Sequence, residues 1–228
     1  KNNSNRKYFK LVPDKGDISI LKIMSSEPAP EHRIINNRKK LKWIVGVLKK
    51  EGLKVGYTSG VYDMLHDGHV EYLAAIKKLC DVLVVGVDDD ELTRIRKPNE
   101  KNRPIDGIDV RLKLLVHNRS TNIVCIRSVK EHPDRLIKDI LPDIAVFSFG
   151  SEKDPIAFEK RIREGIEDYV GELVFLKPMS SNSTTAKIRK VSGNGSHELA
   201  VHLQEVFGSN QRLSKKLEKS INDFFTFK

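Results

Sequence analysis

The sequence predicts an α/β fold with a doubly wound parallel sheet, and three features predict it. Short apolar runs of strand length alternate with helical stretches from Val55 to Leu176. The run over 82–87 is unbroken and apolar, with Gly86 inside it, which is typical of a strand buried on both faces. The chain has 228 residues, which is enough for one such domain with appendages.

The alternating pattern places each expected element. In chain order we expect a strand over 55–59, a helix over 69–79, a strand over 82–87, helices near 89–96 and 107–118, a strand over 123–126, a helix over 133–140, a strand over 144–149, a charged helix near 154–169 and a strand over 173–176. Ligands of such sheets bind at the carboxyl ends of strands, near the point where the strand order reverses. The loops that follow the strands are therefore the candidate site.

Charge and composition divide the chain into three expected segments. These are a basic N-terminal extension with one helix (1–51), the α/β domain (52–191) and a helical C-terminal tail (192–228). The extension holds 13 Lys and Arg against 5 Asp and Glu, so most of the net charge of +10 lies there. We interpret its lysine-rich helix as a solvated face, and a surface for an anionic partner is the sharper alternative.

Several classes of protein do not fit the sequence. No apolar run approaches the roughly 18–20 residues that span a bilayer, so no membrane span is expected. The first residues, which begin with Lys1, carry no apolar secretory segment. Two isolated cysteines, Cys80 and Cys125, suit a reducing compartment. We therefore predict a cytoplasmic protein.

The most informative segment runs from Thr58 to His69, where the first strand gives way to a helix. Gly60 would let the backbone approach a ligand, and Gly68 would permit a tight turn. His69 is expected in the first helical turn, where free amides and the helix dipole favour an anion. The imidazoles of His66 and His69 could then donate hydrogen bonds to neighbouring phosphate oxygens. Zinc is the weaker interpretation, because no cysteine or third histidine lies nearby.

In this strand-to-helix setting, the string from His66 to His69 resembles the HxGH signature of the cytidylyltransferase-like nucleotidyltransferases. That superfamily includes the glycerol-phosphate and ethanolamine-phosphate cytidylyltransferases and the heptose-phosphate adenylyltransferases. The segment from Ser183 to Arg189 resembles the second signature of the family, in which hydroxyls at a helix start hold phosphates. The resemblance covers roughly residues 53–190 and implies a Rossmann-like nucleotidyltransferase fold.

The resemblance also implies a reaction and a set of site residues. A CMP or AMP group would pass from CTP or ATP to a phosphorylated small molecule, such as a phospho-alcohol or a sugar phosphate, with release of pyrophosphate. The expected catalytic residues are His66, His69, Lys97 and Arg189. The expected nucleotide-binding residues are Thr58, Ser59, Gly60, Tyr62, Asp63, Gly68, Asp88, Arg103, Phe147, Ser183, Thr184 and Thr185.

Some of these roles have open alternatives. Mg²⁺ is expected to bridge phosphate oxygens, and Asp63 would either assist the metal or stabilise a turn. Asp88 and Asp89 would contact the ribose or base, or cap a helix. In the charged loop that begins at Lys97, that lysine is the first choice for the α-phosphate and Arg103 the second.

The neighbouring charges Arg94, Arg96 and Lys101 are expected to be solvated. The pair Arg103-Pro104 and the following Arg111 resemble the heptose-phosphate adenylyltransferases. The sequence from Val61 to Met64 instead resembles the ethanolamine- and choline-phosphate cytidylyltransferases. The nucleotide base therefore stays open between adenine and cytosine.

One segment departs from the family pattern. Many relatives carry an acidic Gly-Asp segment after the fourth strand, where this chain reads from Phe147 to Glu152 without an aspartate. A silent nucleotide-binding regulatory module is therefore an alternative, and an RNA-associated protein is ranked last because no aromatic platform accompanies the basic extension. Nucleic acid is not an expected partner, and a homodimer fits the resemblance.

Overall fold

A computed structural model describes residues 30–98, 103–149 and 154–177, together with Lys219. Its centre is a five-stranded sheet in the order β3-β2-β1-β4-β5, and every neighbouring pair is parallel. The strands are β1 (Val55–Gly60), β2 (Val82–Asp88), β3 (Ile123–Arg127), β4 (Ile144–Ser148) and β5 (Glu172–Leu176). The strands β2 and β3 are added on one side of β1, and β4 and β5 on its other side. This reversal in strand order confirms the predicted doubly wound fold.

The helices also follow the predicted order within the described residues. They are η2 (Pro30–Arg33), α3 (Arg38–Lys50), α4 (Asp67–Lys77), α5 (Asp90–Arg96), α6 (Ile108–Val116), α7 (Arg135–Ile140), α8 (Pro155–Ile166) and η3 (Glu167–Tyr169). The helix expected in the N-terminal extension begins at Arg38, because the Asn37 side chain accepts a hydrogen bond from the Lys40 amide and caps the helix there. The extension before Pro30 and, apart from Lys219, the predicted helical tail lie outside the described residues.

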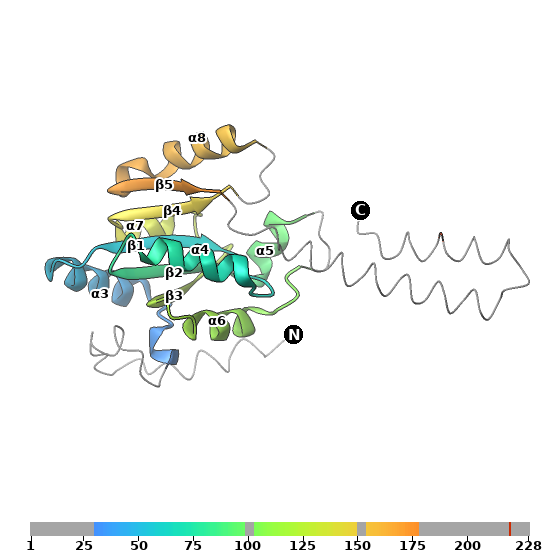
Figure 1. Cartoon of the computed structure of the whole chain (residues 1–228), viewed down its shortest axis with the longest axis horizontal. Coiled ribbons are helices and arrows are strands. Elements are labelled where there is room, and N and C mark those ends of the chain that lie inside the picture. Colours follow the sequence, from blue (N-terminus) through green and yellow to red (C-terminus); the bar gives the residue numbers. More distant parts are fainter. Residues whose placement is uncertain (1–29, 99–102, 150–153, 178–218, 220–228) are drawn as a thin grey trace, which may run out of the picture.

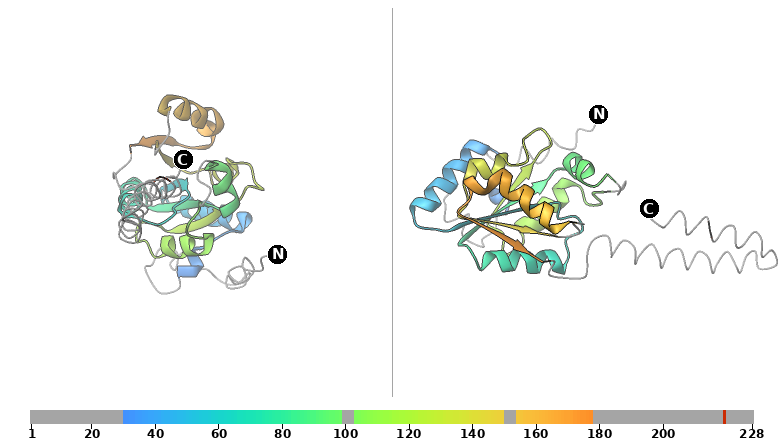
Figure 2. Two further views of the ribbon diagram at one scale, coloured as in Figure 1. Left: turned by 90° about the vertical axis from the view of Figure 1, so that its right-hand side faces the viewer. Right: turned by 90° about the horizontal axis from the view of Figure 1, so that it is seen from above.

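Helices cover both faces of the sheet (Figure 2). Apolar side chains of α3 and α7 pack with alternate residues of β1, β2 and β3 on one face, where Ile166 at the end of α8 joins the same core. Side chains of α4 and α6 pack on the other face. Residues of β2 from Val82 to Val87 are all buried, as the unbroken apolar run predicts. Both layers together fix the strand ends, where the candidate site lies.

The helix of the predicted N-terminal extension belongs to the same core. Leu41, Ile44 and Leu48 of α3 are fully buried, and the Ile35 amide donates to the Val124 carbonyl at 2.9 Å. Trp43 lies on the opposite face of this helix with 61% of its surface exposed. The lysines of this helix, at positions 39, 40, 42, 49 and 50, are therefore exposed or half-buried on the outside of a packed helix.

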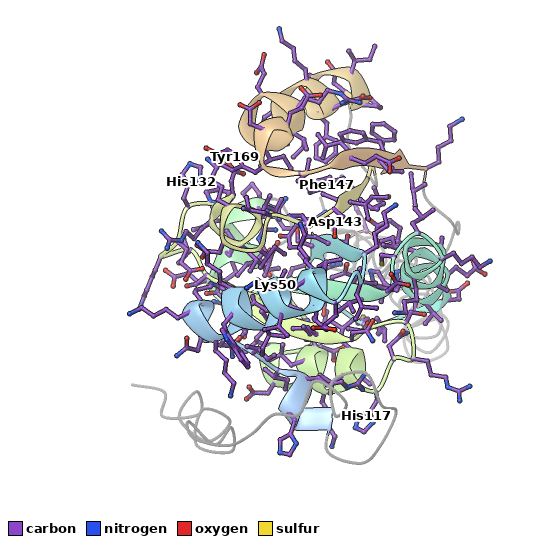
Figure 3. The ribbon with its side chains drawn as sticks, turned by 90° about the vertical axis from the view of Figure 1, so that its left-hand side faces the viewer. Lys50, His117, His132, Asp143, Phe147 and Tyr169 are labelled. Carbon is purple, nitrogen blue, oxygen red and sulfur yellow. The ribbon has the colours of Figure 1, made fainter. Side chains whose placement is uncertain are left out.

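The amino-terminal ends of β1 and β4 are joined by one carboxylate. Asp143, labelled in Figure 3, precedes β4, and its Oδ2 accepts a hydrogen bond from the Val55 amide at 2.7 Å. Its Oδ1 lies 2.9 Å from the Lys49 Nζ of α3. The hydrogen bond between Asp143 and Val55 sets the register of the two strands that flank the switch point.

None of the helices that the structure describes is long and apolar enough to cross a membrane.

The two cysteines give a test of the core. Cys80 is 9% exposed and Cys125 is fully buried, and burial raises the pKa of both thiols, that of Cys125 to about 12. At pH 8 the Cys125 thiolate is present in about one molecule in 10⁴, so a thiol reagent must wait for the protein to open. We expect native Cys80→Ala protein, which retains Cys125 alone, to react with Ellman's reagent far more slowly than the same protein in guanidinium. Equal rates in both conditions would contradict the buried position of Cys125.

Candidate active site

Two stacked histidines lie where β1 passes into α4. His66 has extended backbone and forms the N-cap of α4, and its carbonyl accepts the amides of His69 and Val70 at 2.9 and 3.1 Å. The centroids of the two imidazole rings are 3.9 Å apart, with 25° between the ring planes. The His66 side chain is only 9% exposed. The HxGH string therefore places both rings at the amino-terminal end of an 11-residue helix, as predicted for His69.

The loop before the histidines has strained backbone. Tyr62 has a φ of 55° and Met64 a φ of 48°, both in the left-handed region that non-glycine residues rarely adopt. The Tyr62 ring centroid lies 5.4 Å from that of His69, and a Cβ at Gly60 would lie 3.3 Å from the Tyr62 ring. Gly60 therefore makes room for a tyrosine of the same loop, in addition to any approach by a ligand.

Gly68 has a different position from the predicted one. It lies inside the first turn of α4, and among the described glycines only Gly52 has a positive φ. The prediction that Gly68 permits a tight turn is therefore wrong, because the chain turns at residues 61–65 instead.

Asp63 stabilises this turn. It is 1% exposed, and its two carboxylate oxygens accept the amides of Ile105 at 2.9 Å and Asp106 at 2.8 Å. Arg103 Nε lies 2.7 Å from Asp63 Oδ2. Of the two alternatives left open by the sequence, these contacts favour the turn-stabilising role over a metal ligand. No group of three or more His, Cys, Asp and Glu within the described ranges is arranged to hold a metal ion.

A buried guanidinium joins three loops around the site. Arg111 of α6 is fully buried, and its Nη1 donates to the carbonyls of Val61 at 2.6 Å and Asp88 at 2.7 Å. Its Nε donates to the Asp106 carbonyl, and its Nη2 pairs with Asp90 Oδ1 at 2.5 Å. The sequence pointed to Arg111 only through a resemblance. The structure shows that it links the loops after β1 and β2 to the segment before α6.

A second buried carboxylate lies at the end of β2. Asp88 is fully buried, with Arg96 Nη1 2.6 Å from its Oδ2 and Arg127 Nη1 3.1 Å from its Oδ1. Arg127 also donates to Ser59 Oγ at 2.8 Å. Burial on its own would lower the pKa of Arg127, but Tyr57 and Asp88 act in the opposite direction and the pKa is raised.

These contacts revise one expectation. Arg96 was expected to be solvated, but it pairs with a buried aspartate and keeps 44% of its side chain exposed. Asp88 faces two arginines, and its contact with the ribose or base stays a prediction. Asp89 has the helix-capping role that the sequence left open, because its Oδ1 accepts the Leu92 amide at 2.7 Å.

Lys97 lies directly after α5 at the same edge of the sheet. It is the C-cap of that helix, half-buried, and its amide donates to the Thr93 carbonyl at 3.0 Å. Figure 1 shows α5 at one end of the sheet, apart from the helices that cover its faces. Arg103, the second choice for the phosphate, is 8% exposed and pairs with Asp63. Lys97 is therefore the more accessible of the two cations.

The side chain of Thr58 lies beneath the strand end rather than at its surface. Thr58 is fully buried and its Oγ1 lies 3.0 Å from the Tyr72 hydroxyl, which donates to the Val146 carbonyl of β4. Burial raises the pKa of the Tyr72 hydroxyl, so this group stays protonated. The hydroxyl pair links β1 to β4 at the switch point, so the Thr58 side chain is engaged inside the fold.

The edge formed by β4 and β5 is aromatic. The ring of Phe147, labelled in Figure 3, lies 6.1 Å from that of Phe175, which stacks on Phe149 at 5.6 Å. Phe158 of α8 meets the rings of Phe149 and Phe175 edge-on, each at 6.3 Å. Three of these four rings, at 147, 149 and 175, are half-buried. The segment that departs from the family pattern therefore begins in an aromatic cluster.

The structure brings together only part of the predicted site. Ser59, Gly60, Tyr62, Asp63 and the histidines share one edge of the sheet with Asp88, Lys97, Arg103 and Phe147. The second signature, with Ser183, Thr184, Thr185 and Arg189, lies outside the described residues. Sequence reasoning missed Arg127 and the Asp106 carboxylate, which accepts the Met64 amide at 3.0 Å. A charged residue that directly follows an apolar strand was the available signal for Arg127, as it was for Asp88.

The sheet order, the switch at β1 and the stacked histidines define a doubly wound α/β domain with a polar site at its switch point. Residues 57–191 match the cytidylyltransferase-like family. The chain therefore belongs to that family, as its HxGH string predicts.

Curated relatives agree with this assignment. The chain is 32% identical over 160 residues to a bifunctional protein HldE from Bradyrhizobium sp. (strain ORS 278), covering 70% of this chain and 31% of that protein. It is 34% identical over 157 residues to the protein of the same name from Escherichia coli O1:K1 / APEC, covering 69% and 31%. The chain thus spans about a third of the length of these relatives.

One solved structure supports the fold alone. Pantoate-beta-alanine ligase from Francisella tularensis, complexed with beta-gamma ATP and beta-alanine, superposes with a TM-score of 0.51 at 15% identity. The match covers 83% of this chain and 85% of that one.

Arg111 is the first residue of the site to test. Replacing it by Met removes four hydrogen bonds and leaves buried carbonyls without a donor, so we expect Arg111→Met to lower the free energy of unfolding by about 3 kcal/mol. Lys113→Met, on the exposed face of the same helix, should change it by less than about 0.5 kcal/mol. Urea denaturation followed by circular dichroism measures both, and equal stability of the two variants would contradict the role of Arg111.

Proposed function

We propose that this chain transfers a nucleotidyl group, AMP or CMP, from ATP or CTP to a phosphorylated small molecule and releases pyrophosphate. The observation that carries the proposal is the stacked pair of His66 and His69 at the amino-terminal end of α4, directly after β1. Family membership supports it. The acceptor classes that fit the reaction are phospho-alcohols and sugar phosphates.

The reaction proceeds by in-line displacement at the α-phosphorus. An oxygen of the acceptor phosphate forms a new bond to the α-phosphorus, while the bond from that phosphorus to the bridging oxygen of the β-phosphate breaks and takes its electron pair to pyrophosphate. The acceptor phosphate is already ionised at neutral pH, so the chain need not supply a strong general base. The protein contributes positioning and neutralisation of charge.

The residues divide this work along the edge of the sheet. His66 and His69 would donate hydrogen bonds to phosphate oxygens at the positive end of α4. Lys97 would bridge the acceptor phosphate and the α-phosphate from the end of α5. By resemblance, Thr184, Thr185 and Arg189 would hold the leaving pyrophosphate. Ser59 and Gly60 would bring the end of β1 against the nucleotide.

Mg²⁺ fits this arrangement as an ion carried by the triphosphate. The oxygens of Asp63 and Asp88 already face backbone amides or guanidinium groups, so neither carboxylate is arranged as a ligand. Mg²⁺ usually keeps several waters and binds through substrate phosphates. When bound, the ion would neutralise charge on the phosphates.

A pyrophosphate-release assay with Mg²⁺ tests the proposal directly. ATP, CTP, GTP and UTP are crossed with phosphorylated alcohols and sugar phosphates. Release that needs one nucleotide and one acceptor supports the transfer and identifies both substrates. Nucleotide binding in calorimetry, with no release for any acceptor, would overturn the enzymatic proposal in favour of a silent nucleotide-binding module. That module is favoured by the segment from Phe147 to Glu152, which departs from the acidic Gly-Asp segment of many relatives.

The histidine pair gives the first kinetic prediction. His69→Ala removes one preorganised donor from the phosphates, and we expect kcat to fall about 10²–10³-fold while the protein stays folded. His117→Ala, which removes an exposed histidine after α6, is the matched control and should leave kcat unchanged. Steady-state pyrophosphate release measures both. A folded His69→Ala protein with wild-type turnover would rule out this role.

Lys97 gives the second kinetic prediction. Lys97→Ala removes the cation that would bridge the two reacting phosphates, so we expect kcat to fall about 10²-fold with nucleotide affinity nearly unchanged. Lys50→Ala, at the exposed end of α3, serves as the lysine control. Single-turnover kinetics and nucleotide titration separate the two quantities. A loss confined to nucleotide affinity would make Lys97 a binding residue only.

A further inference from the structure

Helix α5 has little apolar packing to hold it in place. It is seven residues long, and Thr93 is its only buried residue. Its two aliphatic residues are Leu92, which is half-buried, and Ile95, which is 58% exposed. A helix of this length is marginal in water and depends on contacts with the rest of the protein. With so little apolar packing, the polar contacts at its two ends become important.

The two ends of α5 are attached in different ways. At its start, Asp89 caps the helix, and the Asp90 carboxylate pairs with the buried Arg111. At its end, Arg96 Nη1 pairs with Asp88 Oδ2 at 2.6 Å. Lys97 is the next residue. The pair between Arg96 and Asp88 therefore holds the last turn of the helix, which leads into Lys97, against β2.

Asp88 is a rigid anchor for that contact. Its carboxylate is fully buried at the end of the central strand β2, and its second oxygen lies 3.1 Å from Arg127 Nη1. Arg127 is in turn bonded to Ser59 Oγ of β1 and to the Pro133 carbonyl. The anchor thus connects the ends of β1, β2 and β3. A buried carboxylate needs its opposite charges, so the contact with Arg96 resists breaking more than an exposed ion pair does.

We propose that Arg96 and Asp88 form a positioning pair that fixes the last turn of α5 and thereby holds Lys97 at the carboxyl edge of the sheet. The functional consequence rests on the proposed role of Lys97 in transfer, whereas the positioning itself does not. The pair does not touch the reacting phosphates in this assignment. Arg127 keeps Asp88 in place, and Arg96 transmits that position to the neighbouring lysine.

Hydrogen exchange tests the positioning without any substrate. Arg96→Gln keeps the approximate length of the side chain and removes its charge, whereas Arg96→Lys keeps the charge. Arg94→Gln, exposed on the same helix, is the matched control. We expect amide exchange at Lys97, whose N–H donates to Thr93, to be about 10-fold faster in Arg96→Gln than in the control, with Arg96→Lys close to wild type. Equal exchange in Arg96→Gln and Arg94→Gln would overturn the proposal.

Kinetics then test whether the effect passes through Lys97. We expect Arg96→Gln to lower kcat about 10-fold, with KM for the nucleotide little changed, because a misplaced reacting group slows the chemical step. In the Lys97→Ala background, Arg96→Gln should cause no further loss. An equal loss in both backgrounds would show a general structural role and overturn the link to Lys97. If the wild-type protein releases no pyrophosphate, the proposed function fails, and the exchange experiment still decides the positioning.

Discussion

The buried guanidinium of Arg111 is the contact on which the candidate site depends. It donates hydrogen bonds to the loops that follow two adjacent strands and to the segment before α6. Parallel strands end side by side, but nothing in strand pairing dictates where the loops beyond them go. A fully buried cation with five donors in a fixed plane restricts those loops strongly, because each carbonyl must stay in place to satisfy it. The loop from Val61 to His66 is held in position by this arrangement, through the Val61 carbonyl.

The same solution recurs at two more points. Asp63 and Asp88 are buried carboxylates, and each faces an arginine that lies more than seven residues further along the chain. Such pairs contribute little net stability, since desolvation offsets most of their attraction, but they are specific about geometry. That property explains how the left-handed backbone of Tyr62 and Met64 persists. Asp63 accepts the amides of Ile105 and Asp106, and Asp106 accepts the Met64 amide, so the strained turn is tied to the segment before α6 from both sides.

Sequence reasoning predicted the fold well and the wiring of the site poorly, for one physical reason. Strands and helices follow from local periodicity, so the buried run of β2 and the helix after His66 could be located within two residues. The partners of Asp88 could not, because its contacts with Arg96 and Arg127 depend on which strands become neighbours. Arg96 resembles a solvated charge in sequence, and only the position of β2 beneath α5 changes that. The role of Gly60 likewise depends on the left-handed turn of Tyr62, which no periodicity predicts.

The carboxyl edge of the sheet is chemically divided at its switch point. On the β1, β2 and β3 side the buried carboxylate of Asp88 is paired with arginines, and Arg96 is exposed and Lys97 half-buried. The β4 and β5 side carries aromatic rings, with Phe149 stacked on Phe175. A nucleoside triphosphate has the same division, with an aromatic base at one end and phosphates at the other. Under the proposed function, a nucleotide lying across β1 would place its phosphates by the histidines and its base toward the aromatic rings. The acceptor phosphate would then approach from the cationic side, where α5 holds Lys97.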